Sequence, residues 1–114
     1  MLVVGRSNGA IPAFALCREL RQKPEVTSIC LLLCSGAPEQ SQLDIAKGKE
    51  GWPADAVVLT VGSAEKYFGR SAGLKKAAVG AHPPTLVEFN GEHLGEDQHT
   101  MCTALWRLSE NLRA

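Results

Sequence analysis

Three residue types that together perform nucleophilic catalysis follow predicted strands in this sequence. Ser7 follows the first apolar run, Glu65 follows a later one, and His93 lies on a glycine-flanked segment after the last. A serine hydroxyl becomes an effective nucleophile when a histidine takes its proton and a carboxylate orients that histidine. In α/β folds, chemistry gathers at the carboxyl ends of the strands. The three positions therefore predict an acyl-transfer site above one edge of a sheet.

The segment around Ser7 has the spacing Gly-x-Ser-x-Gly, from Gly5 to Gly9. An apolar run precedes it and a helical pattern follows it, which predicts a sharp strand-to-helix turn that exposes the serine hydroxyl. Such a turn holds the serine in a strained backbone conformation. A side chain at either glycine is expected to collide across the bend, which gives both glycines a steric reason. The start of the helix presents N–H groups and a positive dipole end to the same point.

Apolar segments alternate with helical patterns along the whole chain. This alternation predicts right-handed crossovers and a parallel sheet, because a strand, helix and strand connect in that way. We therefore expect a single α/β domain over 1–114, with three layers and about four parallel strands. The expected strands are 2–5, 26–34, 55–61 and 85–89, and the expected helices are 10–21, a short one in 40–49, one within 66–78, and 96–112.

Composition limits the classes of partner. The 114 residues carry 12 basic and 12 acidic side chains, so no global field attracts nucleic acid or an anionic membrane. The longest apolar run, 29–34, is too short to span a bilayer, and no signal peptide is recognised. Cys30 and Cys34 lie about 13 Å apart on one expected strand, too far to form a disulfide. We expect buried free thiols, a cytoplasmic protein, and neither a cofactor nor a metal.

The chain resembles the serine α/β-hydrolases, the family of esterases, thioesterases and lipases. Besides the turn at Ser7, Gly62-Ser63-Ala64-Glu65 is similar to the family's Gly-x-x-Asp segment, with glutamate in place of aspartate, and Gly91-Glu92-His93 resembles its Gly-Gly-His. Leu31–Leu33 with Ser35-Gly36 is similar to the strand after the nucleophile helix.

The resemblance implies hydrolysis of a small ester or thioester. Ser7 would be the nucleophile, His93 the general base, and Glu65 the acid that orients the imidazole. The backbone N–H of Asn8 would donate one hydrogen bond to the oxyanion. Glu39, which follows the second strand, is the substitute acid.

The resemblance covers only the C-terminal half of an α/β-hydrolase. The family places several strands before the nucleophile strand, and an early loop carries a second oxyanion donor. The chain is thus expected to be a truncated form, a fragment or a non-catalytic descendant, with weak or no activity in isolation. Its apolar first strand would be an edge that pairs with another segment or forms a homodimer.

Two other classes of function fit parts of the sequence. Val4-Gly5-Arg6-Ser7, followed by Pro12, also looks like the NADP-binding segment of methylenetetrahydrofolate dehydrogenases. In that case Arg6, Ser7 and the helix start would hold phosphates. A non-catalytic interaction module that keeps the fold without the chemistry is the remaining alternative.

Overall fold

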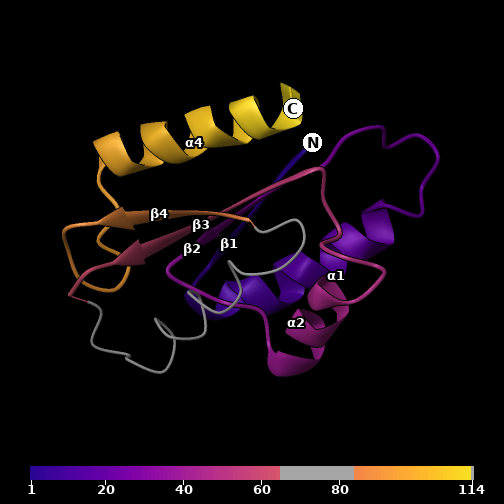
Figure 1. Ribbon diagram of the computed structural model, residues 1–114, viewed down its shortest axis with the longest axis horizontal. Coiled ribbons are helices and arrows are strands. Elements are labelled where there is room, and N and C mark those ends of the chain that lie inside the picture. The colour runs from indigo at the N-terminus through magenta and orange to yellow at the C-terminus, as the bar shows by residue number, and fades with distance from the viewer. Residues whose placement is uncertain (65–83, 114) are drawn as a thin grey trace.

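The computed structural model describes residues 1–64 and 84–113 (Figure 1). Within these ranges, four strands form one parallel sheet whose spatial order is also the order along the chain. The predicted α/β fold with about four parallel strands is therefore confirmed. The strands are β1 (Leu2–Arg6), β2 (Cys30–Cys34), β3 (Ala56–Gly62) and β4 (Thr85–Phe89).

Helices cover both faces of the sheet and complete three layers. In Figure 1, α1 (Ala10–Leu20) and α2 (Gln40–Lys47) lie on one face and α4 (Gln98–Arg113) lies on the other. Alternate side chains of the middle strands enter two separate apolar clusters: Leu31, Leu33 and Leu59 on the α1 face, and Leu32, Cys34 and Val58 on the α4 face. Apart from Thr60 near the end of β3, the side chains of the middle strands are apolar, because successive side chains point to opposite faces that are both buried.

Two element boundaries differ from the prediction for local polar reasons. The second strand begins at Cys30 and not at residue 26, because the N–H of Ile29 donates to the Asp55 carboxylate at 2.8 Å and not to a strand carbonyl. The last helix begins at Gln98, because Asp97 accepts hydrogen bonds from the N–H and the hydroxyl of Thr100 at 2.7 and 2.8 Å. Asp97 therefore caps the helix from outside. The helix predicted within 66–78 lies outside the described residues.

β1 forms one edge of the described sheet and is covered by helix on one face. Val3 is buried under α1, whereas Leu2 and Val4 are 49% and 47% exposed. The reason is the placement of α4, which packs over β2, β3 and β4. An apolar, half-covered edge strand is a surface on which another strand can pair.

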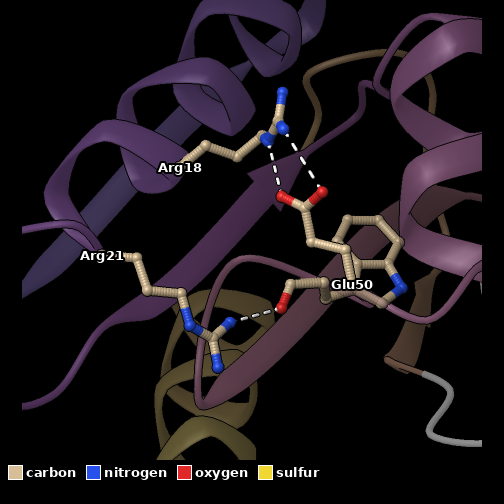
Figure 2. A network of polar contacts seen from close by, with 4 residues as sticks. Arg18, Arg21 and Glu50 are labelled. Carbon is tan, nitrogen blue, oxygen red and sulfur yellow. Dashed lines mark hydrogen bonds and ion pairs between the residues drawn. The ribbon is translucent and has the colours of Figure 1, made fainter.

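The C-terminal half of α1 is attached to the segment that follows α2 (Figure 2). Arg18 holds the Glu50 carboxylate with two N–H groups at 2.8 and 3.3 Å, and Arg21 donates to the Trp52 carbonyl oxygen at 2.7 Å. These polar contacts are exposed, and an exposed ion pair contributes about 1 kcal/mol or less. The Trp52 ring also packs edge-on against Phe14, which is fully buried, at a centroid distance of 5.7 Å. Burying a phenylalanine contributes about 1.5–3 kcal/mol, so apolar packing sets the position of α1.

The four cysteines are free, but they are not all buried. Cys17 and Cys34 are buried, Cys30 is partly covered, and Cys102 is exposed. The prediction of buried thiols is wrong for Cys102, which lies two residues from the buried Thr100 and Ala104. Two residues of helix turn the chain by about 200°, so Cys102 points to the opposite, solvent side. Among the described helices, none has the length and apolarity that crossing a bilayer requires.

Candidate active site

The side chains of Ser7 and His93 meet, although 86 residues separate them in the chain. Ser7 Oγ lies 3.0 Å from His93 Nε2, a hydrogen-bond distance, in a partly buried position. Ser7 comes from the end of β1 and His93 from the loop after β4, so the two reach each other across the end of the whole described sheet. Two of the three predicted catalytic side chains are therefore in contact.

The predicted turn at Ser7 is present. β1 ends at Arg6, a single 3-10 turn (η1, Ser7–Gly9) follows, and α1 begins at Ala10. Ser7 has a φ of +52°, in the left-handed region that side chains other than glycine rarely occupy. Asn8, the predicted oxyanion donor, follows directly within this turn and is exposed.

The steric prediction for the two motif glycines is right for Gly5 and wrong for Gly9. A Cβ on Gly5 would lie 2.7 Å from the Gly9 carbonyl oxygen and 2.8 Å from the Ala13 Cβ, so only glycine lets α1 approach β1 this closely. A Cβ on Gly9 would meet no atom within 4 Å, and its φ of −64° is ordinary for helix. In the 3-10 turn the Gly9 carbonyl faces Gly5 while the Cβ position of Gly9 faces open space, which the motif spacing alone does not reveal.

A third glycine, Gly36, packs against the serine turn from the segment that follows the neighbouring strand, β2. A Cβ on Gly36 would lie 2.0 Å from the Ser7 carbonyl oxygen and 2.7 Å from its carbonyl carbon. Sequence reasoning related Ser35-Gly36 to the family pattern but assigned it no role at the site. The parallel register, which places Arg6 beside Cys34, is the feature that brings residue 36 against the serine turn.

The loop that carries His93 is hydrogen-bonded to the end of β3. Ser63 and Ala64 donate their N–H groups to the carbonyl oxygens of Phe89 and Gly91 at 2.8 and 2.9 Å. A Cβ on Gly62 would lie 2.3 Å from the Gly91 carbonyl oxygen, so this approach also requires glycine. His93 is thus two residues from a backbone anchor. This anchoring places the imidazole relative to the sheet.

A polar cluster of Ser35, Thr60 and Glu96 lies under the same loop, and sequence reasoning did not find it. The Glu96 carboxylate oxygen Oε1 accepts hydrogen bonds from both hydroxyls, and the Thr60 distance is 3.0 Å. Ser35 Oγ also accepts from the Leu94 N–H at 3.1 Å. Burial and, secondarily, the Glu96 charge raise the pKa of the adjacent Cys34 thiol, so that thiol stays neutral at physiological pH. Two hydroxyl residues on buried strand ends are the only sequence signal for this cluster.

Comparisons with known proteins return no match. No family model, no curated protein and no solved structure is significantly similar to the chain. The function is therefore argued from the geometry of the site.

Two residues, Glu65 and Glu39, are the candidate acids from the sequence. Glu65 lies outside the described residues, whereas its neighbour Ala64 donates to Gly91 as described above. Glu39, the substitute acid, is exposed at the start of α2, where its N–H donates to Gln42 Oε1 at 3.1 Å and its carboxylate accepts from the Ser41 hydroxyl at 3.4 Å. These contacts give Glu39 a helix-capping role. Among residues 1–64 and 84–113, no group of His, Cys, Asp or Glu is arranged to hold a metal ion.

Proposed function

We propose that the chain is a serine hydrolase-like protein that transfers the acyl group of a small ester or thioester to water. The observation that carries the proposal is the 3.0 Å distance between Ser7 Oγ and His93 Nε2. A general base must lie within about 2.6–3.2 Å of the atom whose proton it removes. The left-handed backbone of Ser7, at the junction of a strand and a helix, supports the same role.

The chemistry runs in two half-reactions. His93 Nε2 takes the Ser7 proton as Oγ attacks the carbonyl carbon, and the resulting tetrahedral intermediate collapses when the imidazolium returns that proton to the departing alcohol or thiol. Water then attacks the acyl-serine, His93 takes a proton from the water, and the free acid leaves as Ser7 regains its hydrogen.

Two further residues complete the proposal. The Asn8 N–H donates to the developing oxyanion, an interaction that typically lowers a barrier by about 3–4 kcal/mol. We assign to Glu65 the role of orienting the His93 ring, and the support is that it follows Ala64 in the chain, whose N–H donates to Gly91 on the His93 loop. Binding of NADP by Arg6 and Ser7 would leave the contact with His93 without a role, so the acyl-transfer proposal explains more of the site.

Covalent labelling of Ser7 tests the proposal directly. A fluorophosphonate probe requires one attack by an activated serine and no turnover, so it detects the nucleophile even where hydrolysis is slow. The wild type should be labelled at Ser7, the label should be absent from Ser7→Ala, and His93→Ala should react about 10²-fold more slowly or worse. Ser63→Ala is the matched control, because Ser63 is an exposed serine beside the same loop and should not affect labelling.

Two results would refute acyl transfer. One is a folded wild type that reacts no faster than heat-unfolded protein, and the other is a label on a serine other than Ser7. Stabilisation by NADP against thermal unfolding would instead favour the dinucleotide alternative, because a ligand that binds only the folded state raises its stability.

The proposal extends to partner and location. The half-exposed edge of β1 supports pairing with β1 of a second copy, and the four free cysteines support a reducing, cytoplasmic compartment.

A further inference from the structure

One dipeptide directly after β2, Ser35-Gly36, contacts both Ser7 and the loop that carries His93. The Gly36 backbone lies against the main chain of Ser7, where a Cβ would have no room. The hydroxyl of Ser35 accepts a hydrogen bond from the N–H of Leu94, the residue after His93, at 3.1 Å. The relative position of the Ser7 and His93 side chains thus depends on Ser35-Gly36, a segment distant in sequence from both.

The hydroxyl of Ser35 is buried and makes two hydrogen bonds. It accepts from Leu94, donates to Glu96 Oε1, and has no exposed surface. A serine hydroxyl has one hydrogen to donate, so the bond to Glu96 fixes its direction and aims an oxygen lone pair at the Leu94 N–H. Glu96 therefore acts on the His93 loop through Ser35.

Backbone conformation shows that this arrangement is imposed on the chain. Ser35 and Leu94, the two residues joined by this hydrogen bond, have φ values of +50° and +59°. Both lie in the left-handed region, which is sterically unfavourable for a residue other than glycine. Surrounding contacts must therefore hold these conformations, and the hydrogen bonds to Ser35 Oγ are contacts that can do so.

We propose that Ser35 and Glu96 are positioning residues that hold the imidazole of His93 against Ser7. For catalysis this inference rests on the proposed acyl transfer, but the position of the ring can be measured whether or not the protein turns over. Neither residue contacts the reacting atoms. Losing the Ser35 hydroxyl frees the loop on the C-terminal side of His93, and a displacement of about 1 Å lowers reactivity about 10²-fold.

The test follows the His93 ring by ¹⁵N nuclear magnetic resonance, with the ring signals assigned by their loss in His93→Ala. Ser7→Ala defines the signals of a ring that has lost its serine partner. Ser35→Ala and Glu96→Ala should each move the His93 signals from the wild-type values toward those of Ser7→Ala. In the labelling assay, the same two variants should react about 10²-fold more slowly with the probe.

Two matched variants separate positioning from general loosening. Ser35 and Thr60 donate to the same carboxylate oxygen, so the single amide oxygen of Glu96→Gln can serve both and should restore the wild-type signals. Thr60→Val removes a buried hydroxyl from the same carboxylate but leaves the bond between Ser35 and Leu94, so its His93 signals should stay near the wild type.

Several outcomes would overturn the inference. They are wild-type His93 signals in both Ser35→Ala and Glu96→Ala, displaced signals in Glu96→Gln, or an equally large displacement in Thr60→Val. If Ser35→Ala does not fold, as judged by circular dichroism, the comparison of Glu96→Ala with Glu96→Gln decides alone. Failure of the proposed function has a different signature, a folded wild type that the probe does not label while the His93 signals still respond to Ser35→Ala.

Discussion

Replacing Gly36 with alanine should disturb the serine turn more than any other single added methyl group at the site. The new Cβ would lie 2.0 Å from the Ser7 carbonyl oxygen, whereas an ordinary contact between carbon and oxygen is about 3.3 Å or longer. The next two atoms, at 2.7 and 2.9 Å, also belong to the main chain of Ser7. No side chain can rotate away, so the two backbone segments must separate by about 1 Å.

The size of the effect follows from that separation. Forcing an extra methyl group into a packed position typically costs about 1–3 kcal/mol of folding free energy. At roughly 4 °C per kcal/mol for a domain of this size, Tm should fall by about 4–12 °C. Moving Ser7 by about 1 Å should also slow its reaction with the fluorophosphonate probe about 10²-fold. Thermal unfolding followed by circular dichroism and the labelling rate measure the two effects separately.

Gly9→Ala is the control, because it adds the same methyl group to the same turn in open space. Its φ of −64° suits alanine, so the substitution should leave labelling unchanged and raise stability by about 0.4–1 kcal/mol. A Gly36→Ala variant that melts and reacts like the wild type would refute the close approach of β2 to the serine turn. The same conclusion would follow if Gly9→Ala were the more damaging of the two.

Three further predictions concern charge and association. Burial raises the pKa of Cys17 from 9.0 to about 11, so the folded state favours the neutral thiol. The stability that this provides should be intact below pH 9 and lost as pH rises toward 11. Denaturant unfolding at pH 8 and 10.5 measures the loss, which should be smaller in Cys17→Ala. Hydrogen bonds from the Thr100 N–H and hydroxyl lower the pKa of Asp97. The contribution of the ionised Asp97 carboxylate to folding stability should therefore be present above the usual carboxyl pKa and be lost as pH falls through the folded pKa. Asp97→Asn should make the free energy of unfolding less dependent on pH in the acid range. If β1 pairs with β1 of a second copy, the wild type should sediment as a dimer and Val4→Lys as a monomer. Leu16→Lys, at a similarly exposed position on α1, should leave the dimer intact. A monomeric wild type would refute this pairing.

The arrangement of the sheet could be predicted because its signals are local. Each strand is an apolar run bounded by turn residues, and in the structure β3 is buried at every residue from Ala56 to Gly62. The contact between Ser7 and His93 was predicted as a consequence of strand order. Parallel strands bring their carboxyl ends to one edge; Ser7 follows β1 directly, and His93 lies on the loop after β4.

The parts that were missed depend on contacts between distant segments. The closeness of Gly36 to Ser7 follows from the register of β1 with β2, which no local pattern encodes. The hydrogen bonds of Glu96 follow from the path of the loop after β4, and the same residue was predicted to open a helix that in fact begins at Gln98. Gly9 was assigned a steric role because the motif is symmetric in sequence, although the turn it forms is not symmetric in space.

Among the described residues, every non-glycine residue with a left-handed backbone lies at the candidate site: Ser7, Ser35 and Leu94. Each such conformation costs on the order of 1–3 kcal/mol, so the free energy that the rest of the fold supplies is partly consumed at this one edge. Laboratory evolution for heat resistance alone should therefore change these three positions early, and the resulting proteins should be sturdier and less reactive. Under such selection, retention of all three residues would indicate a requirement other than stability.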